Sequence, residues 1–363
     1  MPNYMDRGGW PRLIHAAMKA AGLDADLIFS GMGVPLEKLL AADFQYPHQS
    51  NARFWMRAEQ ITGDADIGLR VGLHHPVYRG QVLQYLHLSS PTFGEGLRRI
   101  FAFQRLLSDA QFQRLEHTDN SCYIALGSKV PGIDHLRHAS ECMICGWVRY
   151  LREMSEGVFT VTLIEFSCAA PAQPEWRSQV FGCPVRYGAT ESRIYFDPTV
   201  LARPSPNAEP ELFCLHERIA AERLKRIASQ DFVEAVHGRI GALLESGKAK
   251  PKYVAQNLGI SESQLVAGLA ELKTSFTREL DACRFQLAKQ LLTQTDVPIS
   301  EICYLTNFSE PSALYRAFKR WCGERPIQYR ERRRAQALGL KSVRGAIDPE
   351  PVISTPVGSM PAR

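Results

Sequence analysis

The side chains best suited to bind another molecule are concentrated in one stretch of this sequence, residues 298–335. That stretch holds eight lysines and arginines against four aspartates and glutamates, and it includes Arg316, Lys319 and Arg320. Residues 1–297 carry equal numbers of basic and acidic residues, so almost all of the formal net charge of +5 belongs to this stretch. Clustered guanidinium and ammonium groups bind anions. The sequence therefore predicts one localised anionic contact rather than a chain coated in positive charge.

The elements that must hold these side chains follow a helix-turn-helix pattern, and the pattern occurs twice. Residues 253–265 combine a short helix, a glycine suited to a left-handed turn (Gly259) and a second helix capped by Ser261. Residues 302–314 repeat the pattern, with Asn307, forty-eight residues after Gly259, in place of the glycine and Ser309 as the expected cap. Residues 276–292 are predicted to form the helix that joins the two units. Two such units at this separation are much more specific than one.

Residues 231–332 resemble the DNA-binding domain of the AraC/XylS family of bacterial transcription regulators. The most specific match runs from Pro298 to Arg330 and includes the phenylalanine-containing second helix, Gly323 and Pro326. Residues 10–220 are similar, less specifically, to the effector-binding half found in one branch of that family, the arabinose-binding-like domain. The matching segments there are Phe181–Ala189 and Tyr195–Asp197. The resemblance implies two recognition helices that enter successive major grooves of promoter DNA, about 34 Å apart.

The second unit is the better equipped of the two to read DNA bases. The resemblance and the residue types assign base contacts to Ser312, Tyr315 and Arg316. Phosphate contacts are assigned to four basic residues that follow, namely Lys319, Arg320, Arg325 and Arg330.

The first unit departs from the family pattern. Ser263, Val266, Ala267 and Gly268 stand where arginine, glutamine or an aromatic residue is common. Ser263 and Gln264 remain the polar candidates for base contacts in this unit. Two interpretations stay open: this unit contacts DNA weakly and mostly through its backbone, or it reads bases by apolar contact with thymine methyl groups.

The whole chain is predicted to divide into four parts. Residues 1–205 predict a mixed α+β effector domain, with helices within 10–62, 93–107 and 136–154 and strands within 111–127, 158–166 and 192–196. Prolines at 204, 206 and 210 mark a boundary. Residues 206–230 contain an amphipathic helix, 211–227, that either packs on its own domain or pairs with a second copy. The all-α DNA-binding domain would span 231–334, and the proline-containing tail 335–363 is expected to be disordered.

Several reactive side chains lie outside the basic stretch. His135, His138, Cys142 and Cys145 share one face of a predicted helix, but one flat face rarely surrounds a tetrahedral ion, so no metal and no cofactor are predicted. His74 and His75 are interpreted as surface residues of a turn. Arg98, Arg99 and Arg105 are interpreted as a solvent face or, alternatively, as counter-ions for a carboxylate effector. No nucleophile elbow, phosphate-binding loop or dinucleotide fingerprint appears, so no catalytic residue and no enzyme activity are predicted.

Together these features predict an effector-responsive regulator of a bacterial operon, an activator that binds double-stranded promoter DNA and RNA polymerase, with a homodimer expected. The effector and its pocket stay unknown, with carboxylic and amino acids as candidates. Nine cysteines, no run of about 18 apolar residues and no visible signal peptide indicate a cytoplasmic protein with reduced thiols and no membrane contact. Two alternatives remain: a regulator that responds to a partner protein or to cysteine oxidation, and, less favoured, an enzyme fused to a DNA-binding domain.

Overall fold

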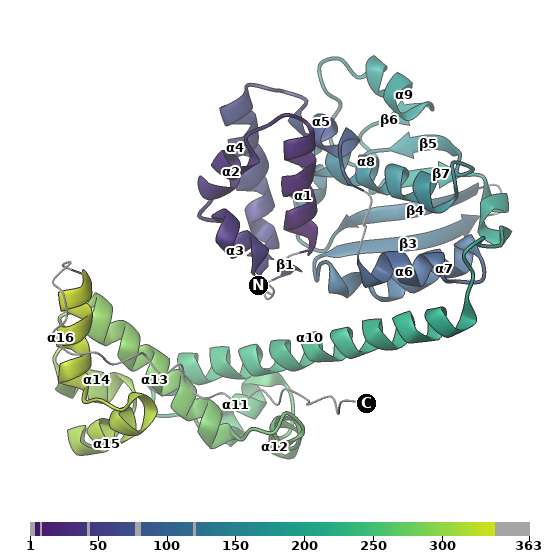
Figure 1. The fold of residues 1–363 in the computed structure, drawn as a ribbon. Coiled ribbons are helices and arrows are strands. Elements are labelled where there is room, and N and C mark those ends of the chain that lie inside the picture. The colour runs from purple at the N-terminus through teal and green to yellow at the C-terminus, as the bar shows by residue number, and fades with distance from the viewer. Residues whose placement is uncertain (1–3, 8, 42–43, 77–80, 119–120, 338–363) are drawn as a thin grey trace, which may run out of the picture. The chain divides into compact units, whose positions relative to one another are not determined.

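The computed structural model describes residues 4–7, 9–41, 44–76, 81–118 and 121–337 (Figure 1). The chain separates into two units between Ile227 and Ala228. This division falls inside one continuous helix, α10 (Pro210–Leu244), which includes most of the segment expected to be a linker and the first residues of the expected DNA-binding domain. Residues 335–337 close the last helix, and the rest of the expected disordered tail lies outside the described residues. Within the described ranges, no helix is long and apolar enough to cross a membrane.

The first unit combines helices with a five-stranded sheet. Its helices are α1 (Gly9–Ala20), α2 (Ala25–Ser30), α3 (Leu36–Leu40), α4 (Asn51–Thr62), α5 (Ile67–Leu73), α6 (Val82–Leu88), α7 (Phe93–Ala102), α8 (Arg137–Met154), α9 (Glu175–Phe181) and the start of α10. The sheet has the order β3 (Gln111–Thr118), β4 (Ser121–Ser128), β7 (Ser192–Phe196), β5 (Val161–Glu165) and β6 (Val185–Arg186). Neighbouring strands are antiparallel except β5 and β6. A short antiparallel pair, β1 (Met5–Arg7) and β2 (Gln45–Pro47), lies outside this sheet. The predicted α+β class is confirmed.

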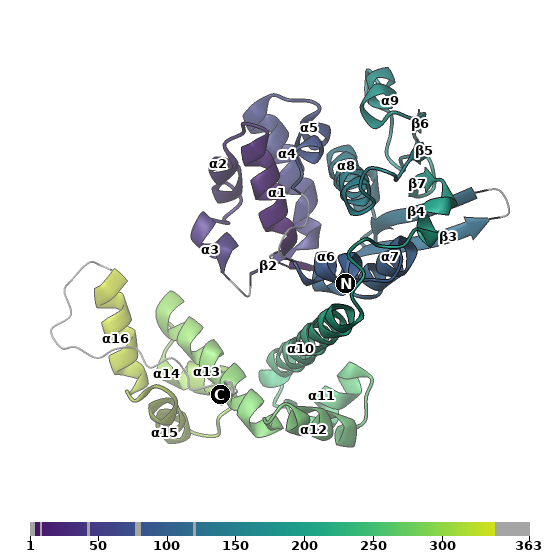
Figure 2. The ribbon, with the colours of Figure 1, turned by 45° about the vertical axis from the view of Figure 1, so that its right-hand side comes forward.

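Helix α8 lies between the N-terminal helices and the sheet (Figures 1 and 2). Small residues let it approach α5 closely: a Cβ added at Gly68 would lie 2.3 Å from the Cα of His138, and one at Gly72 would lie 2.5 Å from the Cβ of Cys145. Real Cβ atoms do not tolerate such distances, so glycine is required at both positions. The same crossing explains why Cys145 is small and almost fully buried.

His75 corrects the expectation of two surface histidines. His74 is exposed, but His75 is 1% exposed and its ring lies 5.4 Å from that of Trp10. The turn before Pro76 follows α5, so it places one imidazole in solvent and turns the other into the core. Burial lowers the pKa of His75 to about 4, because the charged imidazolium loses its hydration.

This burial makes folding stability depend on pH. The pKa of His75 is lower in the folded protein than the value of about 6.5 expected when unfolded, so its contribution is complete above pH 6.5 and is lost as the pH falls toward 4. At pH 5 the loss should be about 2 kcal/mol. When the pH falls from 7 to 5, the free energy of unfolding should decrease less in His75→Gln than in the wild type. Urea titrations at the two pH values measure this. His74→Gln, one residue away, should keep the wild-type pH dependence; equal losses in all three proteins would contradict the prediction.

The second unit is helical throughout its described residues, as predicted. It contains the end of α10, α11 (Pro251–Leu258), α12 (Glu262–Glu271), α13 (Phe276–Gln294), α14 (Ile299–Leu305), α15 (Pro311–Cys322) and α16 (Pro326–Ala337). It has two separate hydrophobic cores, one under each helix-turn-helix. Helix α13 contributes to both, with Leu280 and Leu287 packed on the first core and Phe285 and Leu292 buried in the second. The connecting helix predicted at 276–292 therefore fixes the two helix-turn-helix motifs to each other.

Candidate functional site

The turn of the first helix-turn-helix has the geometry that its sequence predicts. Gly259 ends α11 with a left-handed φ of 69°, and the Ile260 amide donates back to the Ala255 carbonyl at 3.1 Å. Ser261 then caps α12 in a capping box: its hydroxyl accepts from the Gln264 amide, and the Gln264 side chain accepts from the Ser261 amide at 2.8 Å. The start of α12 is therefore held by two reciprocal hydrogen bonds.

Removing this cap should cost about 1 kcal/mol of unfolding free energy, because Ser261→Ala leaves a helix N-terminal amide without its acceptor. The matched control is Ser263→Ala, two residues on, whose exposed hydroxyl bonds to the Ser261 hydroxyl at 2.9 Å. We expect the control to stay within about 0.5 kcal/mol of the wild type. Thermal unfolding of both variants measures the difference, and equal melting temperatures would show that the cap contributes nothing.

The second turn reproduces the first with different residues. Asn307 takes the left-handed conformation (φ 57°), and the Phe308 amide donates to the Cys303 carbonyl at 3.0 Å, the counterpart of the Ile260 bond. The expectation that Ser309 caps α15 is wrong. The N-cap is Glu310, whose extended backbone precedes Pro311 and whose side chain makes no capping hydrogen bond. Proline at the first helical position has no amide to satisfy, which shifts the helix start by one residue.

The exposed start of α15 carries a small hydrogen-bonded cluster. The Arg316 guanidinium lies 3.4 Å from Glu310 and 3.3 Å from the Ser312 hydroxyl, and Ser312 donates to Glu310. The Ser312 hydroxyl, followed by Arg316, lowers the pKa of Glu310. Arg316 is exposed and Tyr315 is half-buried, while Leu314 and Phe318 face the core. The cluster lies at the helix end that reaches base edges in a recognition helix.

Glu310 is a functional candidate that the sequence analysis did not identify. A glutamate can accept a hydrogen bond from the amino group of cytosine, and here it also orients the Arg316 fork. Its position directly before Pro311, at the start of the predicted helix, was the available signal.

The exposed face of α12 offers fewer hydrogen-bonding groups. Gln264 is exposed, but its carbonyl oxygen is held by the capping box, so its amide NH₂ group remains to donate. The neighbouring exposed side chains, Val266 and Ala267, are apolar. Gly268 has a packing reason: a Cβ there would lie 3.0 Å from the Phe232 ring on α10. The first helix-turn-helix therefore keeps a glycine inside α12, which lets α10 approach closely.

The four predicted phosphate-binding residues differ in their surroundings. Lys319 and Arg325 are exposed, and in the part of the chain that the structure describes neither side chain has an ion-pair partner. Arg320 is exposed but pairs with Asp281 at 2.7 Å. Arg330 is half-buried and donates to the Val297 carbonyl, which ties α16 to the loop before α14. This contact gives Arg330 a structural role in the unbound domain.

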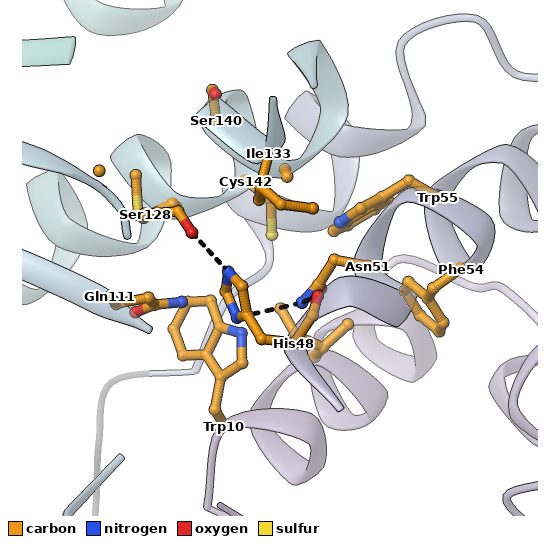
Figure 3. A pocket seen from close by; sticks show the side chains of 14 residues that line it. Trp10, His48, Asn51, Phe54, Trp55, Gln111, Ser128, Ile133, Ser140 and Cys142 are labelled. Atoms are coloured by element: carbon orange, nitrogen blue, oxygen red, sulfur yellow. Dashed lines mark hydrogen bonds between the residues drawn. The ribbon is translucent and has the colours of Figure 1, made fainter. Parts of the chain in front are cut away.

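A small cavity of about 40 Å³ lies inside the first unit (Figure 3). Its walls come from α1, α4, the β3–β4 pair and α8. The lining residues are Trp10, Ile14, His48, Asn51, Phe54, Trp55, Gln111, Gly127, Ser128, Ile133, Ala139, Ser140, Cys142 and Met143. They come from distant parts of the sequence, so no motif could have identified them together.

A chain of hydrogen bonds forms one wall of this cavity. The Ser128 hydroxyl lies 3.0 Å from His48 Nε2 (Figure 3). On the other side of the ring, His48 Nδ1 lies 2.8 Å from the buried Asp6 carboxylate. A carboxylate accepts hydrogen bonds, so Nδ1 carries the proton on this side. Asp6 also accepts from Asn51 at 3.0 Å and from Ser108 at 2.6 Å. The same order of hydroxyl, imidazole and carboxylate occurs in serine hydrolases. Here the Ser128 oxygen also accepts a hydrogen bond from the Val130 amide at 3.0 Å, which gives the hydroxyl a structural contact.

The remaining polar groups considered from the sequence are engaged in structural contacts. His138 lies 3.1 Å from Glu59, and His135 lies 3.1 Å from the Ser167 carbonyl. No group of three or more metal-ligating side chains occurs among the described residues. Arg99 pairs with Glu217 at 3.0 Å and Arg105 with Asp109 at 2.8 Å, and neither lines the cavity.

Comparison with known proteins identifies the two units. The family model of the arabinose-binding N-terminal domain of AraC transcription regulators matches residues 22–205, more than half of the chain. A helix-turn-helix domain model matches residues 254–332. The chain belongs to the AraC family of transcription regulators. This AraC-family regulator has the two-part organisation that its sequence resembled, and the predicted family is confirmed.

Curated relatives of the regulator are also transcription regulators. The ornithine utilization regulator of Pseudomonas aeruginosa is 26% identical over 76% of this chain and 81% of its own. The HTH-type transcriptional regulator VirS of Mycobacterium tuberculosis is 26% identical over 73% of this chain and 78% of its own. The solved structure of the transcriptional regulator CdpR from Pseudomonas aeruginosa aligns with 89% of this chain and 98% of its own, at 18% identity and a TM-score of 0.43. The predicted function, a DNA-binding transcription regulator, is confirmed.

Proposed function

We propose that this AraC-family regulator reads its operator mainly through α15, and that a small molecule bound to the first unit controls this contact. Ser312, Tyr315 and Arg316 are the proposed base-reading residues, with Glu310 added to them. Ser263 and Gln264 supply weaker contacts from α12. The observation that carries this asymmetry is the exposed Glu310–Ser312–Arg316 cluster, which has no counterpart on α12, a helix without arginine or lysine.

Lys319, Arg320 and Arg325 are the proposed phosphate contacts. All three are exposed near or beyond the C-terminal end of α15, where they can follow a DNA backbone while the helix start reaches the bases. Arg330 is set apart from these three because its half-buried guanidinium donates to the Val297 carbonyl, so we expect it mainly to position α16.

The salt dependence of DNA binding tests the asymmetry. Removing one phosphate-binding side chain should reduce the slope of log affinity against log salt by about 0.9. We therefore expect Lys319→Gln/Arg325→Gln to flatten the slope by about 1.8. The control pair Lys250→Gln/Lys252→Gln, exposed at the start of α11, should change it much less. The DNA is a sequence selected from a random pool by the full-length protein. Equal flattening by both pairs would overturn the proposed asymmetry.

The proposed regulator acts in the cytoplasm as an activator that contacts RNA polymerase, and it works as a homodimer. Helix α10 supports the dimer: it packs on the first unit through Phe213, Ile219 and Ala220, but leaves Leu212 and Leu215 exposed. Both interpretations of this helix are therefore compatible with its contacts. Sedimentation equilibrium of the full chain measures the oligomeric state.

The name of the Pseudomonas relative links that protein to ornithine, an amino acid, which agrees with the sequence expectation of a carboxylic or amino acid effector. We do not carry that class over to this regulator. Of the expected counter-ions, Arg99 and Arg105 are already paired with Glu217 and Asp109, and Arg98 is exposed.

Control by cysteine oxidation has less support. Burial raises the pKa of Cys142 and of Cys145 well above that of a free thiol, which suppresses the reactive thiolate. Peroxide treatment that leaves operator affinity unchanged would exclude this alternative.

A further inference from the structure

We propose that the cavity of the first unit binds an uncharged ring compound that carries a hydroxyl or N–H group. This inference deepens the effector response proposed above, on which its regulatory meaning rests. Three large aromatic side chains line the cavity: Trp10 on α1 and Phe54 and Trp55 on α4, all less than 10% exposed. Such surfaces pack best against flat rings.

Charge decides against acids and zwitterions. Among the described residues that line the cavity, none is an arginine, lysine, aspartate or glutamate. A buried carboxylate without a cationic partner loses its hydration and gains little in return. The nearest carboxylate in the hydrogen-bonded wall is Asp6, which would repel a second anion. We therefore expect the cavity to disfavour a carboxylic acid or an α-amino acid.

The orientation of Asn51 selects a hydrogen-bond donor. Its Nδ2 donates to the Asp6 carboxylate at 3.0 Å and to the His48 carbonyl at 2.9 Å, so the amide cannot be turned around without placing oxygen against carboxylate. The Asn51 side chain lines the cavity, and its carbonyl oxygen remains as an acceptor. A hydroxyl or N–H on the ligand satisfies this acceptor.

The His48–Ser128 contact gives the ligand a place to act on the fold. His48 stands at the N-terminal side of α4, whereas Ser128 ends strand β4, and their 3.0 Å hydrogen bond joins the helical layer to the sheet across the cavity (Figure 3). A ligand between Trp10, Trp55 and this bond touches both layers. It therefore binds differently when their separation changes, which is the requirement for an effector.

Three matched probes test the ligand class on the full-length wild type: benzyl alcohol, toluene and benzoate, measured by saturation-transfer NMR. We expect benzyl alcohol to bind about tenfold more tightly than toluene, which lacks the donor, and benzoate to show no binding at this site. Benzoate binding as tight as that of benzyl alcohol, or toluene binding equally well, would overturn the proposed class. This comparison needs no variant and so does not depend on mutant folding.

The site is tested by filling the cavity. Ala139→Leu on α8 adds bulk where Ala139 lines the wall, and Ala221→Leu makes the same change at an exposed position of α10. We expect Ala139→Leu to weaken benzyl alcohol binding about tenfold or more, and Ala221→Leu to bind it as the wild type does. Equal binding by both variants would place the ligand elsewhere. Operator affinity with and without benzyl alcohol is measured on the same wild-type samples, so a missing effector response is recognised separately from a missing ligand site.

Discussion

Replacing Arg316 with alanine should lower the affinity for a selected operator by about 5- to 150-fold, equivalent to about 1–3 kcal/mol, and relax the sequence preference at one or two base pairs. Arg316 is the only arginine of the cluster at the exposed start of α15, where Glu310 and Ser312 hold its guanidinium. An arginine fork in the major groove reads guanine through two parallel hydrogen bonds. Alanine can make neither bond.

The matched control for this experiment is Arg325→Ala. Arg325 is also exposed but lies in the turn before α16, where we propose a phosphate contact. Its loss should weaken all DNA sequences by a similar factor and leave the preferred sequence unchanged. Binding titrations against the selected operator and single-base variants separate the two outcomes. If Arg316→Ala keeps the footprint and affinity of the wild type, α15 does not read bases through this residue.

The largest stability effect is expected in the first unit, at the ion pair between Arg177 and Glu141. Both side chains are fully buried, and Arg177 Nε lies 3.1 Å from Glu141. Arg177→Met should lower the unfolding free energy by about 3–5 kcal/mol, because Glu141 then loses a buried cationic partner. Arg137, which lies 3.3 Å from Glu141, compensates only in part since it is also bound to Asp66.

Two further variants show whether burial is the cause. Arg186→Met removes an arginine whose side chain is 69% exposed and lies 3.8 Å from Glu165, so its cost should stay below about 1 kcal/mol. The double change Glu141→Leu/Arg177→Met removes both buried charges and should recover much of the stability that Arg177→Met removes. Urea unfolding followed by tryptophan fluorescence measures all three. A single-variant loss below about 1 kcal/mol would show that the pair is not an important stabilising contact.

The helix-turn-helix units could be predicted because their signals are local. Gly259 and Asn307 adopt the left-handed turns that their residue types favour, and Ser261 caps a helix through a partner three residues away. Ser309 shows the limit of such reasoning. A serine favours an N-cap, but Pro311 at the next helix position fixes where the helix begins.

The cavity could not be predicted, because long-range contacts create it. Asp6, His48 and Ser128 are separated by tens of residues, and only the tertiary fold brings β1, the turn before α4 and the end of β4 into one hydrogen-bonded chain. The local sequence around the two histidines does not show that His48 lines this cavity whereas His75 is buried beside Trp10.

The sequence by itself determined the class of the two units, the family and the position of the basic surplus, since helix periodicity, turn residues and charge are properties of short segments. The tertiary structure decided which of those side chains are available. It bound Arg330 to a backbone carbonyl, paired Arg99 and Arg105 with acidic residues, and left Glu310 beside Arg316. Which side chains are available depends on the groups that meet after folding, and some of those contacts join residues that lie far apart in the sequence.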